Sequence, residues 1–458
     1  MPNPTLDDRA RDALRRAERF LRSLATEGGY LWWYSADLKE RAGENRATPT
    51  QIWVQPPGTP SVGTAFLRAY EATGEPFYLQ AAREAARALA AGQLQSGGWD
   101  YLIDFDPRES RRWYRRGDLG RVPDAEAARR RNVTTFDDDT TQSALRFLLA
   151  FADAARGRED ASIRSALEYG LNKMREAQYP NGAWPQRWDG APHDPAKYPI
   201  RPARMPRRYP REHARERYHD HYTLNDDTQR DCIRTMLDAH RRLRRPEYLR
   251  SARKGGDFLV LAQLPAPQAA WAQQYNADME PAWARAFEPP ALCSRESAGA
   301  IRTLAELYAQ TRDAKYLRPI PAALDWLRRS QIAPNQWARF YELHTNKPIY
   351  GDIDGRIHYT LEELTEERRR GYAWRGTFGV AAARAAYEQV RNKSAKAGPD
   401  DLGTLEAEAR RVIAALDERG RWIVEGRVQT RVFAANVNTL CAYLERVLKG
   451  SGGKKGTP

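Results

Sequence analysis

Two short acidic runs, each placed directly before an apolar helix pattern, are the first candidates for chemistry in this sequence. Both carry consecutive acids followed by threonine: T-T-F-D-D-D-T-T at 134–141 and H-Y-T-L-N-D-D-T-Q at 221–229. A single carboxylate in each turn would cap its helix and match the helix dipole, and that interpretation stays open for each turn alone. Adjacent carboxylates repel one another unless a cation neutralises them, and such hard oxygen ligands suit calcium. The candidate ligands are Asp137, Asp138, Asn225 and Asp226.

A second pattern places an arginine two residues after a tryptophan, followed by an aromatic residue and a glutamate. It occurs in P-A-W-A-R-A-F-E-P-P-A-L (281–292) and in W-A-R-F-Y-E-L-H-T-N-K-P-I-Y (337–350). An Arg–Glu ion pair over an aromatic ring is common in loops, and that alternative stays open. A planar guanidinium also matches a carboxylate, so Arg285 and Arg339 are candidates for contact with an acidic substrate.

The composition narrows the class of partner. The formal net charge is +14, and the chain contains 13 tryptophans and 22 tyrosines. A basic surface attracts polyanions, and aromatic faces stack on sugar rings and on bases alike. The seven histidines have no metal-ligand spacing, and neither a Gly-rich phosphate loop nor a nucleophile elbow occurs. Three cysteines exclude a Cys-rich zinc module and a dense disulfide framework.

An internal repeat provides the elements that must position these residues. Four segments share one plan, in which two amphipathic helices joined by a turn lead to a glutamine and then a loop with tryptophan. They lie at 63–99, 141–184, 228–271 and 297–337. The repeat is longer than those of short helical solenoids, and the long loops all follow the second helix. We therefore predict an all-α fold, an α/α toroid of helical hairpins whose loops form a cleft on one face.

The predicted domain organisation is one catalytic toroid with a C-terminal extension. The toroid spans 1–391 and includes two Arg- and Pro-rich loops at 105–133 and 187–221, which are either solvated loops or walls of a cleft for a polyanion. We predict a linker at 392–403 and accessory elements within 404–449. The accessory elements are a helix at 404–417, a short hairpin at 421–430 and a last helix at 431–448. A disordered tail is predicted at 450–458.

The location of the protein stays open at this stage. No run of 18 apolar residues occurs, so we predict no membrane span. The N-terminal run M-P-N-P-T-L-D-D-R-A predicts an N-capped helix and not a signal peptide. The expectation is a secreted or periplasmic protein whose export signal has been trimmed, with a cytoplasmic location as the alternative. The oligomeric state is not predicted.

Six motifs, taken together and in order, resemble the pectate lyases of polysaccharide lyase family ten. The resemblance runs from about residue 60 to residue 390. The motifs are T-F-D-D-D-T-T-Q, Y-P-N-G-A-W-P-Q, Y-T-L-N-D-D, W-A-Q-Q-Y, A-R-A-F-E-P-P-A-L-C-S-R-E-S and W-A-R-F-Y-E-L-H-T-N-K-P-I-Y-G-D-I-D-G-R-I-H-Y. This resemblance implies an α/α toroid, a bound Ca²⁺, and an acidic polysaccharide of the homogalacturonan type as substrate, with neither a nucleic acid nor a membrane as partner.

Carried over position by position, the resemblance implies that Asp137 and Asp226 match calcium-binding carboxylates and that Arg285 matches the catalytic base. Two positions depart from the family pattern: Ile353 stands where a substrate-binding arginine is common, and Asp138 stands where asparagine is common. These departures suggest a uronide other than polygalacturonate. The residues expected to contact substrate are Arg339, Lys347, Arg356, Trp184, Trp283 and Tyr372.

The reaction implied by the resemblance is an anti β-elimination that yields 4,5-unsaturated oligouronides. Removal of the C5 proton by Arg285 requires a depressed guanidinium pKa and an alkaline optimum. Two alternatives from other functional classes remain. The first is an inverting glycoside hydrolase that uses Asp226 with Asp137 or Asp138 as acid and base. The second is a non-catalytic protein that binds acidic polymers.

Overall fold

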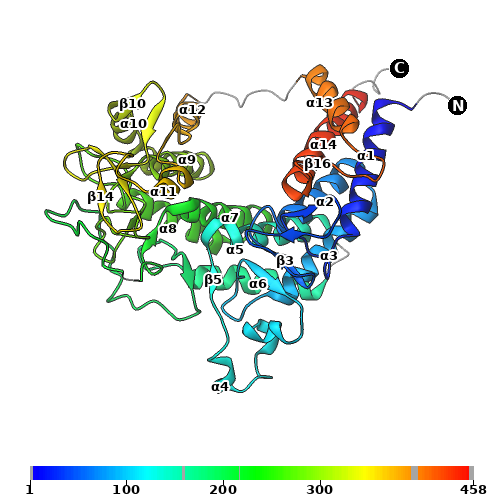
Figure 1. Cartoon of the computed structure of the whole chain (residues 1–458), viewed down its shortest axis with the longest axis horizontal. Coiled ribbons are helices and arrows are strands. Elements are labelled where there is room, and N and C mark those ends of the chain that lie inside the picture. Colours follow the sequence, from blue (N-terminus) through cyan, green and yellow to red (C-terminus); the bar gives the residue numbers. More distant parts are fainter. Residues whose placement is uncertain (1–3, 157–159, 216, 393–400, 453–458) are drawn as a thin grey trace. The chain divides into compact units, whose positions relative to one another are not determined.

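The computed structural model describes residues 4–156, 160–215, 217–392 and 401–452. The chain forms two compact units, which we call unit 1 and unit 2. Unit 1 comprises Met1–Thr135, Thr140–Lys173 and Ala397–Pro458, and unit 2 comprises Phe136–Asp139 and Met174–Lys396. Each unit is built mainly of antiparallel helix pairs (Figure 1), which confirms the predicted all-α class of repeated helical hairpins.

Unit 1 contains the first predicted helix pair, most of the second, and both ends of the described chain. Its longer helices are α1 (Leu6–Arg22), α2 (Thr59–Thr73), α3 (Pro76–Gly92), α5 (Thr140–Ala154), α6 (Ala161–Glu176), α13 (Leu402–Ala414) and α14 (Thr430–Gly452). The loop at 105–133 is mostly irregular, as predicted, with the short turns η1 (Glu109–Arg112), η2 (Arg116–Asp118) and α4 (Asp124–Ala127). The predicted N-capped first helix is confirmed, because Thr5 and Asp8 form a capping box at the start of α1.

The predicted C-terminal hairpin belongs to a four-stranded antiparallel sheet in unit 1. The strand order is β16 (Ile423–Val424), β17 (Arg427–Gln429), β1 (Trp33–Ser35) and β2 (Arg41–Ala42). A second pair joins β3 (Gln51–Trp53) and β4 (Leu102–Asp104), and β5 (Thr134–Thr135) leads to the first acidic turn. Helix α14 packs against α2 and α13, beside α1 (Figure 1). The C-terminal segment therefore helps to form the hydrophobic core of unit 1.

Unit 2 contains the third and fourth predicted helix pairs and the segment that follows them. Its helical elements are η3 (Asp137–Asp139), η4 (Asn225–Asp227), α7 (Thr228–Leu243), α8 (Pro246–Leu261), α9 (Ser294–Thr311), η5 (Ala314–Leu317), α10 (Ile320–Arg329), α11 (Glu366–Gly371) and α12 (Val380–Arg391). One sheet has the order β14 (Ile357–His358), β13 (Pro348–Gly351), β12 (Phe340–Tyr341) and β9 (Leu292–Cys293). The remaining strands are β6 (Arg187–Trp188), β7 (Tyr222–Thr223), β8 (Gln274–Tyr275), β10 (Gln331–Ala333), β11 (Gln336–Ala338) and β15 (Arg375–Gly376).

The turns inside the helix pairs follow from local sequence. In α2 and α7 the helix ends at a left-handed residue, Gly74 and Arg244 respectively, whose N–H bonds back to the last turn. The partner helices α3 and α8 then begin at Pro76 and Pro246, where a missing N–H costs nothing. Apolar residues at helical spacing pack the two helices of each pair together. Each helical hairpin is therefore held by contacts between residues that are close in the sequence.

The repeated tryptophan locks each loop back onto the preceding helix. Its indole is buried and donates a hydrogen bond to a carbonyl near the end of that helix. The pairs are Trp99 to Leu89 (2.8 Å), Trp184 to Met174 (2.8 Å), Trp271 to Leu259 (2.8 Å) and Trp337 to Leu327 (2.6 Å). Trp422 makes the same bond to the Val412 carbonyl at 2.9 Å, so this contact between a loop and the helix before it recurs after α13 in the C-terminal segment.

Other boundaries have mixed outcomes. The hairpin predicted at 421–430 is confirmed by the pairing of β16 with β17. The tail predicted from residue 450 begins too early, because α14 continues to Gly452; residues 453–458 lie outside the described chain. Most of the linker, 393–400, also lies outside the described residues. The predicted division into a 1–391 domain and an accessory region remains a prediction. No helix among the described residues is long and apolar enough to cross a membrane.

Candidate active site

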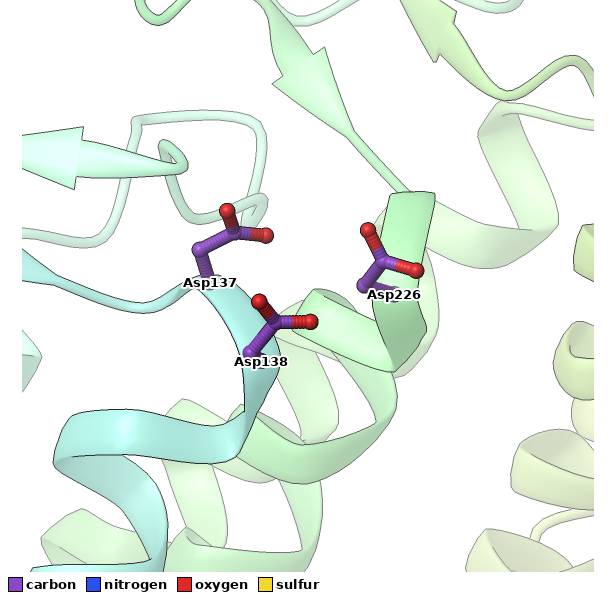
Figure 2. Close-up of side chains that lie close together, drawn as sticks. All are labelled: Asp137, Asp138 and Asp226. Carbon is purple, nitrogen blue, oxygen red and sulfur yellow. The ribbon is translucent and has the colours of Figure 1, made fainter. Parts of the chain in front are cut away.

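The two acidic turns come together in unit 2. Carboxylate oxygens of Asp137, Asp138 and Asp226 lie within 4.8 Å of one another, and all three side chains are half-buried (Figure 2). The turns have the same backbone shape: Asp138 has φ 49° and ψ 35°, and Asp226 has φ 50° and ψ 37°. Aspartate tolerates this left-handed conformation better than most residues do. The repeated sequence thus builds the same turn twice and presents both sets of carboxylates to one point.

This cluster fits a hard cation. Burial raises the pKa of the Asp226 carboxyl; the charge of Asp137 adds to the shift, while Arg295 opposes it. The Nδ2 of Asn225 donates to the Asp226 carboxylate at 2.6 Å, and the Asn225 Oδ1 is buried with no hydrogen-bond partner among the described residues. Crowded carboxylates beside an orphaned amide oxygen form the donor set that calcium prefers. The residues predicted as metal ligands are therefore brought together.

A half-buried arginine next to a buried glutamate supports the second acidic turn. Arg295, at the start of α9, donates to Asp226 at 3.1 Å, and its other Nη lies 3.8 Å from Asp227. The same guanidinium lies 3.4 Å from the carboxylate of Glu296. Burial raises the pKa of Glu296 to about 7, although Arg295 and Arg339 oppose the shift. Arg295 holds the turn by charge, so the turn is supported even without a bound cation.

Arg285 forms a bidentate ion pair with Glu288. Its Nε and Nη2 donate to the two carboxylate oxygens at 2.8 Å and 2.5 Å, and the Glu288 side chain is almost fully buried. The Tyr372 hydroxyl donates to the same carboxylate at 2.8 Å. Burial lowers the pKa of Arg285, but the hydrogen bonds and charge of Glu288 outweigh it, so the pKa lies above its ordinary value. The charge of Asp226 also raises the pKa of Arg285, so the Arg285–Glu288 pair is electrostatically coupled to the second acidic turn.

Arg339 is the second predicted arginine, and it is buried with few partners. Its guanidinium carbon lies 4.4 Å from the centre of the Tyr372 ring. Its Nη2 is 3.8 Å from Glu296, and its Nε has no hydrogen-bond partner within the described part of the chain. A buried guanidinium with an unused donor is suited to a carboxylate brought in by a ligand.

The other predicted substrate contacts have different outcomes. The prediction for Trp184 is wrong: its indole is fully buried, and a Cβ on Gly255 would lie 2.7 Å from the ring. Trp283 lines a cavity beside the site, and its Nε1 donates to the Pro210 carbonyl at 3.0 Å. Lys347 is exposed on the turn after β12. Arg356 is exposed and forms an ion pair with Glu212 at 3.3 Å.

Sequence reasoning missed the residues that hold the predicted ones in place. Glu288, Arg295 and Glu296 all lie in the motif A-R-A-F-E-P-P-A-L-C-S-R-E-S, which was noted but not resolved into pairs. The spacing of three residues between Arg285 and Glu288 was the available signal, and it matches the open alternative of an Arg–Glu pair. That alternative is confirmed for Arg285, whose guanidinium also lies 4.8 Å from the Phe287 ring centre.

Comparison with known proteins gives a clear family match. A sequence model of a family described as pectic acid lyase matches residues 111–336 and 329–382, more than half of the chain. No sequence among curated proteins matches. A solved family 10 polysaccharide lyase from Cellvibrio cellulosa is 21% identical with a TM-score of 0.48, covering 72% of this chain and 97% of that one.

Two further solved structures are similar to this chain, with lower sequence identity and TM-scores slightly below that of the first. A mutant of the Cellvibrio cellulosa lyase in complex with trigalacturonic acid is 20% identical with a TM-score of 0.47, covering 71% of this chain and 98% of that chain. A family 76 α-mannanase from Bacteroides thetaiotaomicron is 10% identical with a TM-score of 0.46, covering 98% of each chain.

Proposed function

Because this chain belongs to the pectic acid lyase family and is a polysaccharide lyase, we propose that it cleaves an acidic polyuronide by calcium-dependent β-elimination. The observation that carries the proposal is the placement of three carboxylates, Asp137, Asp138 and Asp226, within 4.8 Å in the same unit as Arg285 and Arg339. An anionic substrate needs cations, and a hard metal ion needs oxygen ligands. Both requirements are met by neighbouring side chains.

The metal ligands proposed are Asp137, Asp138 and Asp226, with the amide oxygen of Asn225. When bound, Ca²⁺ would supply positive charge to the uronate carboxylate and so make the adjacent C5 proton more acidic. Asp226 is already held by Arg295 at 3.1 Å, which keeps the second turn in place.

Arginines provide the remaining positive charge in the proposal. Arg339, whose guanidinium lies over the Tyr372 ring, is proposed to attract a substrate carboxylate by its charge, which few partners within the described residues offset. The Tyr372 ring contacts Arg339, and the Tyr372 hydroxyl donates to Glu288, the partner of Arg285. Tyr372 therefore helps to fix the positions of both arginines. Exposed Lys347 and Arg356 are proposed to contact more distant uronates, where screening weakens each contact.

Arg285 is proposed to take the C5 proton of the uronate, after which the C4–O bond breaks and the electron pair leaves with the C4 oxygen. The product is a 4,5-unsaturated uronide, and the departing oxygen acquires a proton. This role requires a neutral guanidine, and the ion pair with Glu288 opposes it by raising the Arg285 pKa. The reaction is therefore expected to accelerate with rising pH across the alkaline range.

The hydrolase alternative is disfavoured by the same distances. An inverting glycosidase places its two carboxyl groups about 6.5–9.5 Å apart to admit a water molecule. One oxygen from each of Asp137, Asp138 and Asp226 lies within 4.8 Å of the others, close enough for a single cation to bind all three.

The direct test is the absorbance of a conjugated alkene during digestion of polygalacturonate at alkaline pH, with calcium and again with a chelator. A signal that rises with calcium and is suppressed by chelator supports the proposal. If polygalacturonate gives no signal, the assay is repeated on a panel of other polyuronides. New reducing ends without absorbance would instead identify a hydrolase and overturn the proposed reaction.

A further inference from the structure

A cavity of about 190 Å³ lies in unit 2 between the 187–221 loop and the segment that leads into Arg285. Drug-sized ligands occupy larger pockets of about 300–1,000 Å³, so this volume suits a single small ring. On one side it is lined by Pro206, Tyr209 and Ala214, and on the other by Ala282 and Trp283. The 187–221 loop is therefore the wall of a cavity and not merely a solvated loop.

The cavity is next to the candidate active site. Its Ala282 and Trp283 stand directly before Arg285 in the chain. Tyr218 lines it as well; burial raises the pKa of this tyrosine, and charges of Arg285, Glu288 and Asp137 act on it. A ring bound in the cavity would therefore be a neighbour of the sugar held at Arg285.

The wall of the cavity is fixed before any ligand arrives. The His213 backbone N–H donates to the Gly355 carbonyl at 2.8 Å, and its Nε2 lies 2.9 Å from the Ala284 carbonyl oxygen. The Trp283 indole donates to the Pro210 carbonyl at 3.0 Å. Gly355 has a φ of +76° and its Cβ position is only 3.0 Å from His213, so this close approach requires glycine. A preformed site binds a small ligand without paying to order a loop.

The lining combines ring faces with a few polar groups. Tyr209, Tyr218 and Trp283 provide aromatic surface, the kind that stacks on the C–H faces of sugars. Asn276 and Glu280 add polar groups to the lining; the Asn276 Oδ1 accepts from the backbone N–H groups of Asp278 and Glu280, so its Nδ2 is the amide atom left for a hydroxyl group. This mixture is that of a carbohydrate site and not of an apolar void.

The charges that line the cavity favour a uronate less than those of the candidate active site do. Glu280 lines it, and its carboxylate pairs with Arg204 at 2.9 Å, so the pair brings no net positive charge. Arg208 also lines the cavity, but it lies on the exposed part of the loop, where solvent and salt screen its charge. By contrast, the candidate active site contains Arg285 and Arg339. We infer that the cavity is a subsite for one uncharged sugar ring, located beside the position of cleavage.

This inference rests on the proposed function and extends it: the substrate would be an acidic polysaccharide that carries a neutral sugar next to the cleaved uronate. Such a substrate would use the arginines for its uronate and the cavity for its neutral ring. A plain polyuronide would leave the cavity without its ligand and would be cleaved with a higher KM.

The test uses the full chain and a panel of neutral methyl glycosides, with methyl galacturonate as the charged comparison. Ligand-observed NMR reports binding without any need for turnover. Ala214→Trp places a bulky ring at the cavity wall from an exposed position, and Ala196→Trp makes the same change at an exposed alanine elsewhere in the loop. The expected result is a signal for at least one neutral glycoside that Ala214→Trp reduces at least fivefold and Ala196→Trp leaves in place.

Two outcomes would overturn the inference. One is the absence of binding by every neutral glycoside, and the other is equal binding in Ala214→Trp and in the unmodified protein. Because this readout is binding, it is separate from the alkene assay. If no polyuronide gives an alkene signal but a neutral glycoside binds, the lyase proposal fails and the subsite is supported. If polygalacturonate is cleaved but no neutral glycoside binds, only the subsite is overturned.

Discussion

Arg285 and Glu288 are joined by two hydrogen bonds, of 2.8 Å and 2.5 Å, between a part-exposed guanidinium and a buried carboxylate. The pair positions the arginine that is proposed to take the substrate proton, and it also raises the pKa of that arginine. Position and proton affinity are therefore set by one contact. This contact predicts how the pH dependence of the enzyme will respond to mutation.

Glu288→Gln should move the rising alkaline limb of kcat/KM to lower pH. Removing the carboxylate charge lowers the Arg285 pKa, so the neutral guanidine forms at lower pH. The measurement is a pH profile with a uronide that the unmodified protein cleaves. An unchanged limb in an active variant would argue against Arg285 as the base.

Tyr372→Phe is the matched control for that profile. It removes the hydroxyl that donates to Glu288 at 2.8 Å but leaves the carboxylate charge in place. With one hydrogen-bond donor fewer, the Glu288 carboxylate interacts more strongly with Arg285. The alkaline limb of the kcat/KM profile should therefore stay in place or move slightly to higher pH. A shift to lower pH in both variants would point to a general disturbance of the site.

Arg285→Ala should lower kcat by about 10²–10⁴-fold, the usual contribution of a positioned base. Arg285→Lys should be nearly as impaired, because an ammonium group cannot make the bidentate pair with Glu288. Calcium binding, measured by calorimetry, should survive in both variants. An Arg285→Ala enzyme with normal turnover would remove Arg285 from this role.

Asp226→Ala should abolish the effect of calcium on both activity and thermal stability. A ligand that binds the folded state raises stability by about 2.7 kcal/mol at one hundred times its Kd. We expect calcium to raise the Tm of the unmodified protein and of Asp278→Asn, an exposed acid paired with Arg201. An equal rise of Tm in Asp226→Ala would place the ion elsewhere.

Arg339→Ala should weaken substrate binding far more than Arg356→Ala. Arg339 is buried with an unused donor, and a hydrogen bond to a charged group is worth about 1.5–3 kcal/mol. Arg356 is exposed and pairs with an exposed glutamate, an arrangement worth about 0–1 kcal/mol. The measurement is KM for a series of oligouronides. An equal rise of KM in the two variants would show that the burial of each arginine does not determine how much it contributes to substrate binding.

Glu18 in α1 provides a test of stability that is independent of the active site. It is 2% exposed, and burial raises its pKa to about 7 against the opposing charge of Arg22. A carboxyl whose folded pKa is raised stabilises the fold at low pH, and that stability is lost as pH rises through the folded pKa. Between about pH 4.5 and pH 8, Glu18→Gln should gain about 1–3 kcal/mol relative to the unmodified protein.

The control for Glu18 is Asp12→Asn on the same helix, since that side chain is largely exposed. Chemical unfolding at several pH values should show little change for it across the same range. A parallel pH dependence in Glu18→Gln and the unmodified protein would assign the loss of stability to another group.

The local structure of this protein could be predicted from the amino-acid sequence alone. The helix pairs of both units depend on short-range features of the sequence. These features are the spacing of apolar residues and the prolines and left-handed residues at the helix ends. The acidic turns are equally local, because each builds its backbone from one run of residues. Their repetition was enough to predict that Asp137 and Asp226 would meet.

Tertiary packing decided which side chains are available for chemistry. Trp184 and Trp283 each follow an alanine in a loop, yet the first is fully buried against Gly255 of α8 and the second lines a cavity. Glu288 and Glu296 are both buried beside arginines, and burial raises the pKa of each carboxyl. For Glu288 the hydrogen bonds and charge of Arg285 outweigh burial and the pKa is lowered, whereas for Glu296 burial prevails and the pKa is about 7. Exposure and pKa depend on residues far apart in the chain, because desolvation and charge act through space, whereas helical periodicity acts along the sequence.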